Sequence, residues 1–186
     1  MSIKFDALFP AGYEVRVIES APADALVFER PGSVHSGEVI VEVTTDGGRC
    51  WVGAARAGGP SVRGALSGVF STPAKTGLLL LGRGDAYFVD VEAPERFEAI
   101  DSGGPVVAVR PALDEGLMLL ASPWTITALG DDGVRWQTGR LAIEGIRMDE
   151  VQAGQLAGVA DPGDDEPRDF VVDLHTGCHE GGVPFD

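Results

Sequence analysis

The chain has 186 residues, of which 44% are hydrophobic and 23% charged, and its formal net charge is −15. These proportions are typical of a folded globular domain and exclude a disordered chain. The negative charge argues against nucleic acid as a partner, because phosphate binding requires clustered Lys and Arg. No apolar run approaches the roughly 18 residues of a membrane span, and no secretory signal is predicted at the start, so we expect a cytoplasmic protein without a membrane partner.

The 26 glycines and 12 prolines separate short runs in which apolar and polar residues alternate. Such alternation is typical of strands, and it is clear in Tyr13–Glu19 and in Glu38–Val43, where Val39, Val41 and Val43 would point inward. Leu78–Leu81 is apolar on both faces, which predicts a central strand. Further strands are expected at 25–29, 50–52, 62–70, 87–91, 105–110, 117–121, 125–129, 134–138, 141–148, 155–160 and 170–174. The sequence therefore predicts an all-β fold, an antiparallel meander of short strands.

These strands fall into four groups of similar size within a single domain of residues 1–186. The groups lie near 13–55, 61–99, 104–138 and 139–175. Two local echoes indicate repetition: DGGRCW (46–51) is similar to DGVRW (132–136), and GGPSV (58–62) is similar to GGPVV (103–107). A period near 40 residues with four short strands is typical of propeller blades.

The stretch Leu117–Trp136, which ends in ITALGDDGVRW, resembles the blade repeats of the quinoprotein and WD families of β-propellers. FVVDLHTG (170–177) resembles the end of a blade strand, and the resemblance covers about 100 residues in all. It implies at most four small blades, with Ile3–Phe9 completing the last sheet as its fourth strand. The same strands could instead form a β-sandwich or a barrel-like meander, so both architectures are retained.

Three possible metal ligands, His175, Cys178 and His179, lie close together near the end of the chain. Histidine and cysteine are preferred ligands of zinc, but a tetrahedral site needs three or four donors, and the remaining candidates are His35 and Cys50. Two cysteines are also too few for a disulfide framework, and we expect both to be reduced.

Alternation along the preceding strand points Phe170, Val172 and Leu174 inward, which leaves His175 at the exposed end of the strand before a turn. We therefore predict that the segment is a strand end and its turn. No metal or other cofactor is expected, and a metal site at His175, Cys178 and His179 is the alternative.

The string DSGGP (101–105) resembles the sequence around the nucleophile of chymotrypsin-like serine proteases, which are also all-β. A catalytic serine needs a histidine base that a third group orients. The histidine upstream of Ser102 is His35, and its context, SVHSG, does not match that family. A Gly-Gly-Pro turn into a strand is the expected role, and a hydrolase at Ser102 is the alternative. Trp51, Trp124 and Trp136 are expected to pack in or partly within the core rather than to form a ligand platform.

Negative charge is concentrated at the C-terminal end, where residues 149–186 contain ten acidic residues and one basic residue, Arg168. Such a surface is often only a solvated face, but its field also raises association rates with a basic partner. The acids expected to contact that partner are Asp161, Asp164, Asp165, Glu166 and Asp169.

The predicted function is thus that of a non-enzymatic domain that binds a protein with a basic surface, in the manner of an immunity or inhibitor protein. A small-ligand-binding β-domain is the first alternative, and a hydrolase that uses Ser102 or a metal site is the second. A second copy that closes an open sheet edge would give a homodimer.

Overall fold

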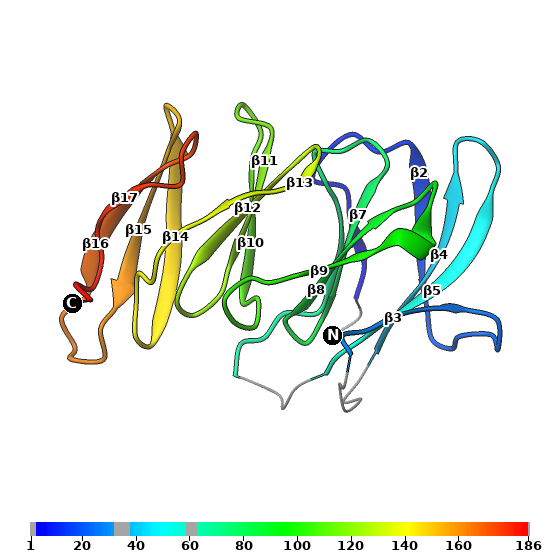
Figure 1. The fold of residues 1–186 in the computed structure, drawn as a ribbon, viewed down its shortest axis with the longest axis horizontal. Coiled ribbons are helices and arrows are strands. Elements are labelled where there is room, and N and C mark those ends of the chain that lie inside the picture. Colours follow the sequence, from blue (N-terminus) through cyan, green and yellow to red (C-terminus); the bar gives the residue numbers. More distant parts are fainter. Residues whose placement is uncertain (1–2, 32–37, 59–62, 186) are drawn as a thin grey trace. The chain divides into compact units, whose positions relative to one another are not determined.

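The structure, a computed structural model, describes residues 3–31, 38–58 and 63–185. In these residues nearly all regular structure is β, which confirms the predicted all-β class, and the strands form four sheets (Figure 1). The chain divides into two compact units, Met1–Asp101 and Ser102–Asp186. None of the described helical structure is long and apolar enough to cross a membrane.

The first unit contains two sheets. One has the order β2-β4-β5-β3, with strands Tyr13–Ile18, Glu38–Thr45, Cys50–Arg56 and Leu26–Phe28. The other has the order β1-β6-β7-β8-β9, with strands Phe5–Asp6, Gly68–Ser71, Gly77–Gly82, Asp85–Asp90 and Glu98–Ile100, and a 3-10 helix η1 (Pro94–Arg96) before its last strand. All pairings are antiparallel except β1 with β6 and β3 with β5, which are parallel.

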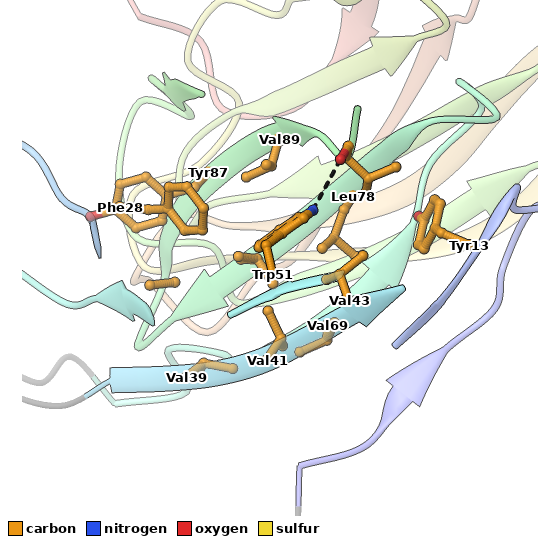
Figure 2. Packing of buried hydrophobic residues seen from close by; sticks show 13 residues of the cluster. Tyr13, Phe28, Val39, Val41, Val43, Trp51, Val69, Leu78, Tyr87 and Val89 are labelled. Atoms are coloured by element: carbon orange, nitrogen blue, oxygen red, sulfur yellow. Dashed lines mark hydrogen bonds between the residues drawn. The ribbon is translucent and has the colours of Figure 1, made fainter. Parts of the chain in front are cut away.

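Inward residues of both sheets form the core of this unit (Figure 2). Val39, Val41 and Val43 of β4 are buried as predicted, although Ile40 is buried as well. Strand β7 is buried along its whole length, as expected of a central strand. Two aromatic side chains also satisfy backbone carbonyls: Trp51 Nε1 donates to Val91 O at 3.0 Å, and the Tyr13 hydroxyl donates to Gly77 O at 2.5 Å. Buried rings with satisfied polar atoms stabilise the core without leaving an unpaired donor.

The second unit contains two four-stranded antiparallel meanders in sequence order. The first comprises β10 (Ala108–Ala112), β11 (Leu117–Ala121), β12 (Ile126–Gly130) and β13 (Gly133–Gln137). The second, named the C-terminal sheet, comprises β14 (Gly145–Gln152), β15 (Gln155–Asp161), β16 (Arg168–Asp173) and β17 (His179–Gly181). Both contribute to one core cluster. Such a meander has the strand number of a propeller blade, and the choice between a propeller-like array and a sandwich or barrel stays a prediction.

The expected position of the first strand is wrong. Instead of completing the last sheet, β1 pairs with β6, and Phe5 is in register with Val69. The fourth strand of the C-terminal sheet is β17, which pairs with β16. The strand expected at 62–70 begins only at Gly68, and residues 59–62, part of the GGPSV echo, lie outside the described residues.

Candidate functional site: the solvent face of the C-terminal sheet

One face of the C-terminal sheet packs on the core and the other faces solvent. Phe170 and Val172 of β16 are buried, as is Leu174 beyond it, which confirms the predicted alternation. A bulge between Met148 and Glu150 shifts the register of β14 against β15. The outward positions, named here the solvent face, are Arg147, Glu150, Gln152, Gln155, Ala157, Val159, Asp169, Val171, Asp173 and Glu180.

The solvent face has a small apolar centre bordered by carboxylates. Register places Glu150, Ala157, Val171 and Glu180 in one row across the four strands, with acids at both ends. Val171 is 37% exposed, which is high for a valine in the middle of a sheet. Exposed apolar area inside a polar rim is the composition of a protein interface.

The cation of this face, Arg147, is already paired. Its Nε and Nη2 donate to the two carboxylate oxygens of Asp149 at 2.6 and 3.0 Å. This bidentate pair holds the pKa of the Asp149 carboxyl below its ordinary value and raises the pKa of Arg147, to which the charge of Asp169 also contributes. Arg147 therefore directs its hydrogen bonds to Asp149 and interacts with Asp169 only through its charge.

Several of the predicted partner-binding acids shape their own loop, between β15 and β16. Asp161 Oδ1 accepts the Gly163 N–H at 2.8 Å, and Asp164 Oδ1 accepts the Glu166 N–H at 3.0 Å, as in Asx turns. Arg168 pairs with Asp164 at 3.0 Å and with Glu166 at 3.7 Å.

The remaining predicted acids are differently placed. Asp165 is exposed, with a φ of +63° in the loop, and Asp169 lies on the solvent face in β16. Within the described part of the chain, neither they nor Glu150 and Glu180 form an ion pair. Reasoning from sequence missed Glu150 and Glu180, because only the pairing of β14 and β17 brings them onto this face.

The segment that contains His175 and Cys178 is the turn from β16 to β17. Asp173 Oδ1 accepts the Thr176 N–H at 2.8 Å, the Thr176 hydroxyl at 2.9 Å and the His175 N–H at 3.0 Å. These bonds hold the pKa of the Asp173 carboxyl below its ordinary value, and the bond from the Thr176 N–H has the largest effect. The turn is therefore fixed by the side chain of Asp173.

His175 and Cys178 are exposed, and His179 opens β17 rather than ending the turn. No group of three His, Cys, Asp or Glu in the described ranges is arranged to hold a metal ion, and the further candidate His35 lies outside those ranges. A hollow of about 330 Å³ lies beside the turn, lined by Gln155, Val171, Asp173, Cys178, His179 and Glu180. It lies between Val171 and β17, and most of its lining side chains are polar.

Ser102 is buried, with 2% of its surface exposed. Its hydroxyl donates to Gly104 O at 2.7 Å, and Thr125 Oγ1 donates to Ser102 O at 2.8 Å. Gly103 has a φ of +68°, so these bonds hold a tight turn before β10, as the Gly-Gly-Pro interpretation predicts. The hydroxyl is thus used in a local backbone contact, and the proposed base His35 is not among the described residues.

No protein-family model and no curated protein matches the sequence. Among solved structures, the N-terminal domain of Nup159 is similar at a TM-score of 0.40 and 15% identity, over 99% of this chain and 54% of that chain. A structure of an S. cerevisiae Dbp5 variant bound to Nup159, a Gle1 variant, IP6 and ADP is similar at 0.40 and 17% identity, over 96% of this chain and 51% of that chain. The CNH domain of AfRom2 is similar at a TM-score of 0.35 and 10% identity, over 92% of this chain and 64% of that chain. The chain spans about half the length of the first two, and TM-scores this low assign neither a fold nor a function.

Proposed function

We propose that this chain is a protein-binding β-domain, and that the solvent face of its C-terminal sheet binds a partner with a basic surface. The observation that carries this proposal is the row Glu150, Ala157, Val171 and Glu180, in which unpaired carboxylates border exposed apolar side chains. Asp165 and Asp169 add further negative charge at the loop and in β16.

The arrangement supports two separable contributions to binding. The apolar centre around Val171 gains from removal of water, at about 25 cal/mol per Å² of apolar surface buried. The carboxylates attract Lys and Arg of the partner and accelerate encounter, an effect that salt screens. The partner is therefore expected to present cationic side chains around an apolar contact.

The same charges oppose self-association through this face. Two copies would bring Glu150, Asp169 and Glu180 of each chain together, and like charges across an interface are unfavourable. A homodimer, if formed, would use another surface, such as an open sheet edge. The finer proposal, an inhibitor that covers the basic active site of an enzyme, rests on charge complementarity alone.

A matched pair of variants tests the proposal. The face variant carries Glu150→Gln, Asp169→Asn and Glu180→Gln. The control variant carries Glu14→Gln, Glu19→Gln and Asp24→Asn, three exposed acids of the first unit, and has the same net charge. The probe is a set of synthetic peptides that combine lysines with a leucine or phenylalanine, titrated into the ¹⁵N-labelled chain.

We expect amide shifts to concentrate on β14–β17 and affinity to fall about tenfold in the face variant, while the control variant binds as the natural chain does. Affinity should also weaken as ionic strength rises from about 0.05 to 0.5 M. Equal losses in the two variants, or shifts spread evenly over both units, would refute a specific face.

A further inference from the structure

A second hollow, separate from the solvent face, is built by the DSGGP turn. It measures about 270 Å³ and is lined by Gly103, Trp124, Thr125 and Arg140. The glycines permit its construction: a Cβ at Gly103 would lie 2.5 Å from Thr125 Oγ1, and one at Gly104 would lie 2.6 Å from the Trp124 ring. Because the backbone approaches so closely, the turn and the indole stand side by side.

Arg140 is held in place without a carboxylate partner. Its Nε donates to Ala142 O at 3.0 Å, and its guanidinium carbon lies 4.8 Å from the centre of the Phe185 ring. No acid in the described part of the chain forms an ion pair with it, whereas Arg135, Arg147 and Arg168 each pair with at least one acid. The Nη1 and Nη2 groups, which form the fork that matches a carboxylate, have no partner among the described residues.

Trp124 supplies an apolar wall. Its Nε1 donates to Ile143 O at 3.1 Å, so the indole orientation is fixed and its one donor is already used. The Thr125 hydroxyl is likewise used, since it donates to Ser102 O. Trp124 is half-buried, within the expected range of core or partly buried packing. The hollow thus offers one cation, one aromatic surface and few free polar groups.

We propose that this hollow binds a small organic acid, with its carboxylate on the Arg140 guanidinium and its apolar group against Trp124. The volume is slightly below the roughly 300 Å³ at which pockets for drug-sized ligands begin, which suits an acid of about ten non-hydrogen atoms. A monocarboxylate fits better than a phosphate, because the chain carries a net charge of −15 that repels a dianion more strongly.

The test uses phenylacetate and its neutral isostere phenylacetamide, titrated separately into the ¹⁵N-labelled full chain, with inorganic phosphate as a third probe. We expect phenylacetate to give saturable shifts at Gly103 and at the Trp124 indole N–H. Phenylacetamide should bind at least about tenfold more weakly, because it lacks the charge that pairs with Arg140. Phosphate should bind no more tightly than phenylacetamide.

Variants assign the charge to one residue. Arg140→Gln should weaken phenylacetate binding about tenfold or more. Arg140→Lys keeps the charge but loses the fork, so its affinity for phenylacetate should lie between those of Arg140→Gln and the natural chain. Arg16→Gln, a matched change at an exposed arginine of β2, should leave phenylacetate binding unchanged. If Arg140→Gln fails to fold, Arg140→Lys and the comparison of phenylacetate with phenylacetamide on the natural chain still test the proposal.

The proposal is overturned if phenylacetate gives no saturable shift up to about 20 mM, or if phenylacetamide binds as tightly. Tighter binding of phosphate would also overturn it, since the hollow would then be a general anion site. Equal loss in Arg16→Gln and Arg140→Gln would overturn it as well, since only the overall charge would then matter.

Discussion

Tyr13 joins the two sheets of the first unit through one buried hydroxyl. Burial raises the pKa of Tyr13 far above its ordinary value of 10.0, and its hydroxyl donates to Gly77 O. Replacement by Phe should lower the free energy of unfolding by about 1 kcal/mol at pH 7, because Gly77 O loses this donor.

The stability of the chain at alkaline pH provides a second prediction for Tyr13. A raised pKa contributes stability that is fully present below the unfolded value near 10 and is lost as the pH rises toward the folded value. The natural chain should therefore lose stability above pH 10 more steeply than Tyr13→Phe. Burial also raises the pKa of Tyr87, so the variant should still lose some stability at high pH, but less than the natural chain. Urea unfolding between pH 7 and 11 measures both slopes, and parallel curves would contradict the assignment to Tyr13.

Asp173 should make the β16–β17 turn sensitive to acid. Its pKa is depressed, so its contribution is present above the unfolded value near 3.8 and is lost as the pH falls through the lower folded value. Asp173→Ala should unfold at lower urea than the natural chain at pH 7, and the difference should shrink below pH 4. Asp169→Ala, on the same strand but without a role in the turn, is the control. A difference that persists unchanged at pH 2 would contradict this role.

At single positions, the sequence predicts local geometry better than it predicts partners. The inward and outward sides of Phe170–Leu174 and the turn after Ser102 follow from alternation and from glycine, both of which are local properties. The surroundings of Arg140 do not, because its contact with Phe185 depends on how the chain returns past β17.

Among the elements, β15 shows how closely the strands of the C-terminal sheet pack. A Cβ at Gly158 would lie 2.4 Å from Arg147 O and 2.4 Å from Phe170 Cζ. Gly158→Ala should therefore cost about 1–3 kcal/mol of unfolding free energy, because backbone and ring must both move. Gly145→Ala in β14, where a Cβ meets open space, is the matched control and should cost under about 0.5 kcal/mol. Similar losses in the two variants would refute the packing argument, and chemical denaturation measures both.

Strand prediction succeeds where the apolar pattern is strong and fails where pairing decides. Leu117–Ala121 was predicted with its observed bounds, because it is a short apolar run between turns. β1 has two residues and β17 has three, too few for any period to show, and both exist because a neighbouring strand offers hydrogen bonds. β14 begins later than predicted and carries a bulge, so simple alternation does not describe it.

For the whole molecule, two separate core clusters favour two unfolding steps over the single domain that the sequence suggested. One cluster includes Trp51, whereas Trp136 packs against the other. Leu119→Ala, a fully buried change in the second cluster, should destabilise the second unit by about 2–5 kcal/mol.

Fluorine NMR of the chain labelled with 5-fluorotryptophan distinguishes two unfolding steps from one. In the Leu119→Ala variant the Trp136 signal should report unfolding at lower urea than the Trp51 signal. The natural chain supplies the reference midpoint for each signal. Loss of both signals at one midpoint in the variant would show that the units unfold together and would support the single domain predicted from the sequence.

The parallel pairing of β1 with β6 also sets an order of events during synthesis. Phe5 leaves the ribosome early, but its register partner Val69 follows only after the whole β2–β5 sheet has been made. The nascent first unit therefore has to keep an unmatched strand from pairing elsewhere for several seconds of translation. The second unit, whose strands all pair with their neighbours in sequence, can form hairpin by hairpin as it emerges. Chaperone dependence and translation-speed effects should consequently fall on the first hundred residues rather than on the acidic end of the chain.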